Sequence, residues 1–173
     1  KDVTHRLAVG SDVGEILADK YAGFNIVLLC SLECISVSLR RDNTGYLSRT
    51  ELSALLGIQP EKIFKTLVTQ GNDRNFYVFD VPVNRELDLK KAANAVGEKS
   101  IEMIKSKELL PLTGYIHGGC SPIGMKKKFP TYIEESCMNF EKITVSGGMK
   151  GAQLLISSAE LVTFTDATVC EVT

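Results

Sequence analysis

Residues 113–131 read TGYIHGGCSPIGMKKKFPT, a glycine-rich stretch that ends in a run of lysines. Gly118, Gly119 and Gly124 lie close together in it. Glycine has no side chain and adopts positive φ readily, so such a backbone can press against a ligand and point N–H groups at it. The lysines that follow suit the phosphates of a polyanionic ligand. The same residues are also consistent with a surface loop followed by a solvated charge run.

Length and charge narrow the class of protein. A chain of 173 residues, of which 44% are hydrophobic, is long enough for one domain with a substantial core. Because there is no repeat or linker, we expect a single domain over residues 1–173, in which residues 1–30 are an uninformative extension. The net charge of −1 excludes a globally basic nucleic-acid-binding protein. Any contact with nucleic acid would depend on a local patch, and Lys126, Lys127 and Lys128 form the densest one.

The cysteines indicate a reducing compartment. Five cysteines are an odd number, no two have C-x-x-C spacing, and the chain has only two histidines. This argues against a disulfide framework and a zinc site, so we expect no metal and no cofactor. No apolar run reaches the roughly 18 residues that a membrane span needs, and Lys1 begins no recognisable signal peptide. We therefore expect a soluble, cytoplasmic protein with no membrane partner.

Capping signals predict several helices. Residues 48–57 have the spacing of a capping box, an apolar face and a glycine stop. Asp88 is placed to cap a helix that continues through Val96 and closes at Gly97. Further helical turns are expected at residue 60, at 107–110 and at 158–163.

Strand signals are interspersed irregularly with these helices. Residues 64–69 and 76–81 are joined by turn residues and predict a hairpin, with β-branched and aromatic side chains in its second strand. Residues 35–39 alternate apolar and polar side chains as a half-exposed strand does, whereas residues 28–35 fit a helix or a buried strand equally well. Further short strands are expected at 100–104, 132–133, 142–145, 153–156 and 168–172. This irregular order favours an α+β fold over regular βαβ units.

Four motifs in this order resemble the YbaK/EbsC family of aminoacyl-tRNA deacylases, which is related to the editing domain of bacterial prolyl-tRNA synthetases. The resemblance covers residues 50–165 and is greatest to the free-standing Cys-tRNA deacylase branch. It implies a mixed β-sheet curled towards a barrel, with surrounding helices. The motifs are Ile63-Phe64-Lys65-Thr66-Leu67, Leu87-Asp88-Leu89-Lys90-Lys91, the loop Tyr115–Gly124, and Val145-Ser146-Gly147-Gly148 with Gly151.

The resemblance also implies a set of site residues. Lys65 falls in the family's lysine motif and would place the charged 3′ end of aminoacyl-tRNA, although a lysine at a strand entry can also simply extend to water. Gly118, Gly119 and Ser121 would donate hydrogen bonds to the oxyanion of the ester. Tyr115 and Ser146 complete the substrate-binding set, and Lys126, Lys127 and Lys128 would contact tRNA.

The family's cysteine-specific members are thought to let the thiol of the substrate attack its own ester carbonyl, which forms a cyclic thiolactone and frees the tRNA. Holding the groups together then supplies the catalysis, with no protein nucleophile. Ser121 is an alternative nucleophile, for which His117 is the nearest base in sequence, but the loop spacing alone does not establish that pair. Cys120 is a further thiol in the loop, and we expect it to be a spectator.

Two residues depart from the family pattern. Leu39 falls where a pocket tyrosine is common, and Gln153 where an acidic residue is common, which puts the preference for cysteine in question. The predicted function is trans-editing deacylation of mischarged Cys-tRNA(Pro). The alternatives are a deacylase for alanine or serine, a non-catalytic module that binds tRNA or a synthetase, and a plain globular scaffold. The expected partners are aminoacyl-tRNA and prolyl-tRNA synthetase, and the oligomeric state is open.

Overall fold

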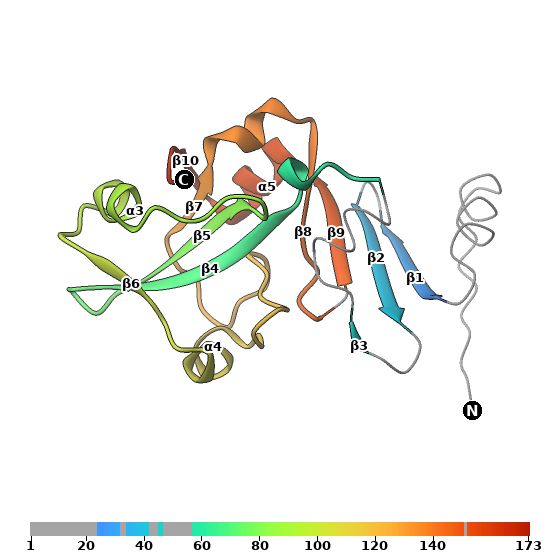
Figure 1. Ribbon diagram of the computed structural model, residues 1–173, viewed down its shortest axis with the longest axis horizontal. Helices are drawn as coiled ribbons and strands as arrows, with labels where there is room; N and C mark the ends of the chain where they lie inside the picture. Colours follow the sequence, from blue (N-terminus) through green and yellow to red (C-terminus); the bar gives the residue numbers. More distant parts are fainter. Residues whose placement is uncertain (1–23, 32–33, 42–44, 47–56, 151) are drawn as a thin grey trace.

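The chain folds into two β-sheets with helices packed around the second sheet (Figure 1). This computed structural model describes residues 24–31, 34–41, 45–46, 57–150 and 152–173, with side chains from residue 57 onward. The helix predicted at residues 48–57 lies outside the described residues except at its glycine stop. None of the helices in the described ranges is long and apolar enough to cross a membrane.

The first sheet is antiparallel, with the strand order β1-β2-β9-β8 and a short strand, β3, that pairs with β2. Residues 28–35 fit either a helix or a strand by sequence, and those of them that the structure describes, 28–31 and 34–35, lie in the antiparallel pair of β1 and β2. The strands of this sheet are β1 (Phe24–Ser31), β2 (Cys34–Arg41), β3 (Gly45–Tyr46), β8 (Lys142–Ser146) and β9 (Ala152–Ser157).

The second sheet is mixed, with the strand order β10-β7-β5-β4-β6. The predicted hairpin is its centre: β4 and β5 are antiparallel, whereas β5 pairs with β7 in parallel. A single parallel bridge between Ile63 and Thr144 joins this sheet to the first. The strands of this sheet are β4 (Phe64–Gly71), β5 (Phe76–Pro82), β6 (Ile101–Met103), β7 (Thr131–Glu134) and β10 (Thr168–Cys170). The predicted α+β class with a mixed sheet and surrounding helices is confirmed.

Local capping accounts for the helices. The Asp88 carboxylate accepts hydrogen bonds from two backbone N–H groups, and Gly97 closes the helix at φ +76, as predicted. The helix predicted at 107–110 is longer than expected and contains Pro111, because Gly114 closes it only after Thr113. The helices are η1 (Pro60–Lys62), α3 (Leu89–Val96), α4 (Ser106–Thr113), η2 (Glu135–Asn139) and α5 (Ser158–Thr165).

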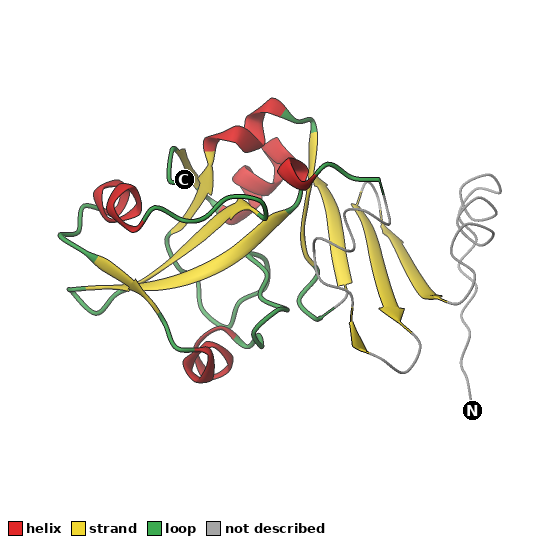
Figure 2. Cartoon of the chain, in the orientation of Figure 1, coloured by secondary structure: helices red, strands yellow, loops and turns green. Residues whose placement is uncertain are grey.

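The helices α3 and α4 cover opposite sides of the mixed sheet (Figure 2). On the α3 side, Ala92 and Ala93 pack with Phe79 and Val81. On the α4 side, Leu109 packs with Val68, Val78 and Cys120. A third cluster contains Phe64, Ile143 and Val145, and thereby ties the two sheets together.

We expect Phe64→Ala to lower the free energy of unfolding by about 3–5 kcal/mol, because Phe64 is fully buried between the two sheets. Phe164→Ala is the matched control, since this ring is 71% exposed and its removal should change the free energy by no more than about 0.5 kcal/mol. Urea denaturation measures both. Equal losses would show that Phe64 does not hold the sheets together.

Candidate functional site

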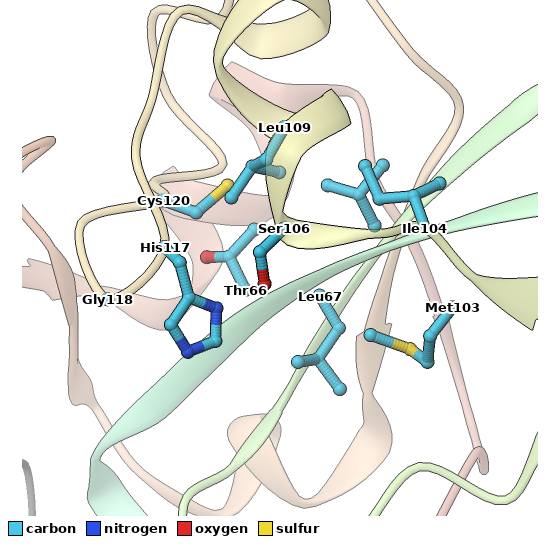
Figure 3. A pocket seen from close by; sticks show the side chains of 10 residues that line it. Thr66, Leu67, Met103, Ile104, Ser106, Leu109, His117, Gly118 and Cys120 are labelled. Atoms are coloured by element: carbon cyan, nitrogen blue, oxygen red, sulfur yellow. The ribbon is translucent and has the colours of Figure 1, made fainter.

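A cavity of about 120 Å³ lies between β4, the segment that leads from β6 into α4, and the glycine loop (Figure 3). Most of its wall is apolar, and its polar side chains come from all three of these segments. Its lining residues are Thr66, Leu67, Val68, Met103, Ile104, Ser106, Leu109, His117, Gly118 and Cys120. The predicted loop therefore forms one wall of a partly open cavity.

The cavity lies against a stretch of β4 that lacks a strand neighbour on one side. On that side, the residue before β4, Ile63, forms a bridge with Thr144 of β8. Farther along, Val68 O accepts a hydrogen bond from the N–H of Ile104, which follows β6, at 3.2 Å. Between these points, residues 64–67 pair only with β5 within the described part of the chain. We call residues 64–67 the open edge of β4.

The backbone of Thr66 faces away from β5 at this open edge. The Val83 N–H donates to Ile63 O at 2.8 Å, which shows that the backbone groups of Ile63 point towards β5. Alternate residues of an antiparallel strand direct these groups to opposite sides. Thr66, three residues beyond Ile63, therefore directs its N–H and C=O to the outer side, as Val68 does.

The side chain of Thr66 is held by a buried carboxylate. Thr66 and Asp80 are cross-strand partners, and the Thr66 hydroxyl donates to Asp80 Oδ1 at 2.6 Å. Asp80 is completely buried, and Thr66 is nearly so. The Thr66 hydroxyl is therefore a fixed part of the cavity wall.

The glycine loop packs against the turn that follows Ser146. A Cβ atom at Gly119 would lie 3.0 Å from the Cα of Met149, and a Cβ at Gly148 would lie 3.0 Å from the Tyr115 ring. Any side chain at Gly119 would push the two backbones apart. The Tyr115 hydroxyl closes the loop by donating to Ile123 O at 2.5 Å, and burial raises the pKa of this phenol.

The two predicted glycine donors differ. The Gly119 N–H donates to Ile116 O at 2.9 Å, so it is engaged within the loop. Gly118 lines the cavity at φ +86, and its N–H bonds to none of the described residues. The structure therefore favours Gly118 over Gly119 as a donor to a ligand.

The predicted serines are buried and shape turns. Ser121 Oγ accepts the Ile123 N–H at 3.3 Å, and Ser146 Oγ accepts the Gly148 N–H at 3.4 Å. Ser121 is not among the residues that line the cavity, whereas His117 is. This arrangement offers no support for a Ser121–His117 nucleophile pair.

Lys65 does not line this cavity. Its Nζ atom pairs with Glu86 Oε1 at 2.9 Å, and the two side chains are 14% and 89% exposed, respectively. The side chains of bridge partners lie on the same face, so those of Ile63 and Thr144 do. Because side chains alternate along a strand, Lys65 and Ser146, each two residues farther on, also lie on that face. The side chain of Lys65 therefore lies on the same face as Ser146. It lies on the opposite face from the side chain of Thr66, the next residue of β4, which lines the cavity.

Gln153 lies on the same face as Ser146, because the two are cross-strand partners. Its side chain is buried, and Oε1 has no hydrogen-bond partner among the described residues. Leu39 lies in β2 opposite Ile26. At this position, where the family commonly has an acidic residue, the chain therefore has a neutral amide.

The three consecutive lysines point to different places. Lys126 Nζ donates to Leu110 O at 3.4 Å, at the end of α4, whereas Lys128 pairs with Asp166 at 3.0 Å, at the end of α5. Lys127 is exposed and lies beside a groove of about 280 Å³ that Phe164 also lines. The triplet is not one uniform patch.

The thiols of Cys137 and Cys170 are poor nucleophiles. Burial, together with the Asp80 and Glu134 carboxylates, raises the pKa of the Cys137 thiol to about 11, and burial also raises the pKa of Cys170. Cys120 is buried and lines the cavity. No group of three or more His, Cys, Asp or Glu side chains in the described ranges is placed to hold a metal.

Comparison with known proteins decides the family. Residues 47–164 match the aminoacyl-tRNA editing domain family. The chain belongs to this family, in its YbaK/EbsC branch. This editing domain is 46% identical over 128 residues to EbsC of Enterococcus faecalis, which is assigned as a Cys-tRNA(Pro)/Cys-tRNA(Cys) deacylase, and the match covers 74% of this chain and 78% of EbsC. The predicted enzyme class, aminoacyl-tRNA deacylase, is confirmed with the family.

Synthetases and solved structures agree with this assignment. A proline–tRNA ligase of Thermosipho melanesiensis is 30% identical over 100 residues, which are 58% of this editing domain and 17% of the ligase. A crystal structure assigned as a trans-editing enzyme for prolyl-tRNA synthetase superposes with a TM-score of 0.70 at 25% identity, covering 93% of this chain and 94% of the other. A hypothetical protein of known structure, at 23% identity and a TM-score of 0.70 over 92% of this chain and 97% of the other, has the same fold.

Sequence reasoning missed Thr66 as a cavity residue of the editing domain, and it treated His117 only as a nearby base. The signal for Thr66 was available in the hairpin, because a turn at residues 71–75 brings Thr66 opposite Asp80. The hairpin alone did not indicate which face of β4 packs against the glycine loop.

We expect Gly119→Ala to reduce deacylation by about 10- to 100-fold, because the added Cβ meets the backbone of Met149 and shifts the loop against the turn. Gly97→Ala is the control: it strains a residue at φ +76 with open space around it, at the far end of α3. It should cost about 1–2 kcal/mol of stability without loss of activity. Deacylation kinetics and urea denaturation of both variants test this. Full activity of Gly119→Ala would contradict the packing role of this glycine.

Proposed function

We propose that this editing domain acts in trans to remove cysteine from mischarged Cys-tRNA(Pro). The observation that carries the proposal is the small, mostly apolar cavity bounded by the open edge of β4 and the glycine loop. Because an apolar cavity of about 150 Å³ can hold benzene, a cavity of about 120 Å³ has room for a small thiol or aliphatic side chain but not for a large one. The assignment of EbsC as a Cys-tRNA(Pro)/Cys-tRNA(Cys) deacylase supports cysteine as the amino acid.

In this proposal, Lys65 holds the 3′ end of the tRNA through its phosphate or ribose oxygens. The Lys65 ammonium is bound by Glu86, which is 89% exposed. An ion pair with such an exposed partner contributes at most about 1 kcal/mol, so a phosphate can replace the carboxylate at low cost. Lys65 and the cavity flank the same short stretch of β4, which would let one ligand reach both.

The glycine loop supplies the polar contact to the reacting carbonyl. The Gly118 N–H is available at the cavity wall and is positioned by the packing of the loop on Met149 and Lys150. A donor held in place stabilises the oxyanion without having to reorganise during the reaction. Ser121, Tyr115 and Gly119 support the loop, and Ser146 supports the turn beneath it.

The reaction needs no nucleophile from the protein. The thiol sulfur of the bound cysteinyl ester attacks its own carbonyl carbon, forming a C–S bond as the C–O bond to the ribose breaks. The thiol proton passes to the departing 3′ oxygen, and the products are a thiolactone and free tRNA. Confinement of the ester in a small apolar cavity favours this intramolecular step over random collision with water.

The tRNA body would extend past the lysine triplet. All three are exposed, and Lys127 and Lys128 line the Phe164 groove. Lys126 and Lys128 are bound to protein oxygens, at Leu110 and Asp166 respectively. We propose all three as phosphate contacts, with Lys127 contributing most. Because the substrate arises on prolyl-tRNA synthetase, that enzyme is the proposed partner. The cytoplasm, where translation takes place, is the proposed location.

Comparison of Cys-tRNA(Pro) with Ser-tRNA(Pro) tests the amino acid and the mechanism. The two substrates differ by one atom, and the serine hydroxyl is a far weaker nucleophile than the cysteine thiol. We expect deacylation of Cys-tRNA(Pro) to be at least about 100-fold faster in single-turnover assays, with thiolactone as the first product. Ala-tRNA(Pro) is the third substrate in the same assay. Equal rates, or faster release of alanine or serine, would assign the enzyme to another mischarged amino acid.

Lys65→Ala and Glu86→Gln separate the role of the ammonium from that of the ion pair. Both substitutions remove the ion pair that these residues form at 2.9 Å, Lys65→Ala by removing the ammonium and Glu86→Gln by neutralising the carboxylate. We expect Lys65→Ala to reduce kcat/KM for Cys-tRNA(Pro) by about 100-fold or more, since the substrate is misplaced, whereas Glu86→Gln should not reduce it. If wild type binds tRNA in a salt-dependent manner but cleaves no ester, the protein is a binding module, a reading that the Gln153 amide would favour.

A further inference from the structure

We infer that Thr66 recognises the α-ammonium group of the aminoacyl ester and makes the site selective for aminoacyl groups with a free amine. The inference rests on the proposed function, because it assigns the cavity to the aminoacyl end of the substrate. It adds a specificity rule that cavity size alone does not set: an N-blocked ester, such as that of a peptidyl-tRNA, is refused.

The first observation is the direction of the Thr66 hydrogen bond. A hydroxyl has one proton, and that of Thr66 is donated to Asp80 Oδ1 at 2.6 Å. The lone pairs of Thr66 Oγ1 are what remains for a ligand in the cavity. Thr66 therefore offers an acceptor, and a ligand must bring a donor.

The second observation is the backbone of the same residue. The Thr66 C=O lies on the open edge of β4, on the side of β4 where the Val68 C=O accepts a hydrogen bond from Ile104. No strand in the described part of the chain pairs with Thr66 on that side. One residue thus presents two acceptor groups at the cavity, a hydroxyl and a carbonyl, beside its own backbone N–H on the same edge.

The third observation is the charge behind this wall. The ten residues that line the cavity include no aspartate, glutamate, lysine or arginine, and His117 is the only one of them with a basic side chain. Asp80 is completely buried directly behind Thr66. A carboxylate that polarises the hydroxyl strengthens its attraction for a cationic donor in a medium of low dielectric.

An α-ammonium group matches these three features. It carries three N–H donors, a positive charge and a small volume, and it lies two bonds from the ester carbonyl that the Gly118 N–H would contact. Acylation of the nitrogen removes the charge and two of the donors. It also adds atoms next to the two acceptor groups of Thr66, where the ammonium would lie.

Binding of stable analogues tests the inference without chemistry. The probes are 3′-deoxy-3′-(cysteinylamino)adenosine, in which an amide replaces the ester, and its N-acetyl derivative, both measured by isothermal titration calorimetry. We expect wild type to bind the free amine about 10- to 100-fold more tightly, as charge-assisted hydrogen bonds allow. Thr66→Val should bring this ratio close to one, and Thr66→Ser, which keeps the hydroxyl, should retain it.

Thr69→Val is the matched control. Thr69 is a buried threonine on the same strand whose hydroxyl donates to Tyr77 O at 3.4 Å, and it is not among the residues that line the cavity. We expect this variant to keep the amine preference.

Equal affinity of wild type for the two analogues, or no measurable binding of the free amine, would overturn the inference, and neither result needs a variant to fold. An unchanged ratio in Thr66→Val would overturn it as well. Failure of the proposed function shows separately, as an absence of Cys-tRNA(Pro) cleavage by the same wild-type preparation, because the analogue measurement involves no cleavage.

Discussion

The site depends on how β4 changes partners along its length. On one side β4 is paired with β5 throughout, but on the other side it leaves β8 after Ile63 and meets β6 only near Val68. The backbone between these points is held in extended form by β5, and no strand among the described residues pairs with its other side. A strand edge that is both rigid and unpaired is a good place for a ligand, because its donors and acceptors are fixed before binding.

The glycine loop closes over this edge because two backbones touch. Gly119 lies against the backbone of the turn after Ser146 with no room for a Cβ, and in that turn Gly148 lies against the side-chain ring of Tyr115. The two motifs are far apart in the sequence, yet each requires glycine for the sake of the other. Their glycines therefore hold the cavity wall in place as much as they provide donors.

Two polar pairs on neighbouring residues of β4 have opposite characters. Lys65 is paired with a largely exposed carboxylate, and such a pair is weak and exchangeable. Thr66 is bound to a carboxylate that is completely buried, and breaking such a bond costs about 1–3 kcal/mol. A ligand can thus displace Glu86 from Lys65, whereas the hydroxyl of Thr66 stays bound to Asp80 when a ligand binds. This contrast supports the two proposed roles, an exchangeable contact from Lys65 to phosphate and a fixed contact from Thr66 to the aminoacyl group.

The sequence alone determined the local elements and the family. The Asp88 cap, the Gly97 stop and the hairpin from Phe64 to Pro82 follow from side chains that act within a few residues, and the ordered motifs identify the editing domain. Only the tertiary structure decided that Thr66, and not Lys65, lines the cavity with Gly118. Adjacent residues of a strand direct their side chains to opposite sides, so whether the Thr66 or the Lys65 side chain faces α4 and the glycine loop depends on which side of β4 packs against them. That packing is fixed by contacts between segments far apart in the chain, which no local pattern records.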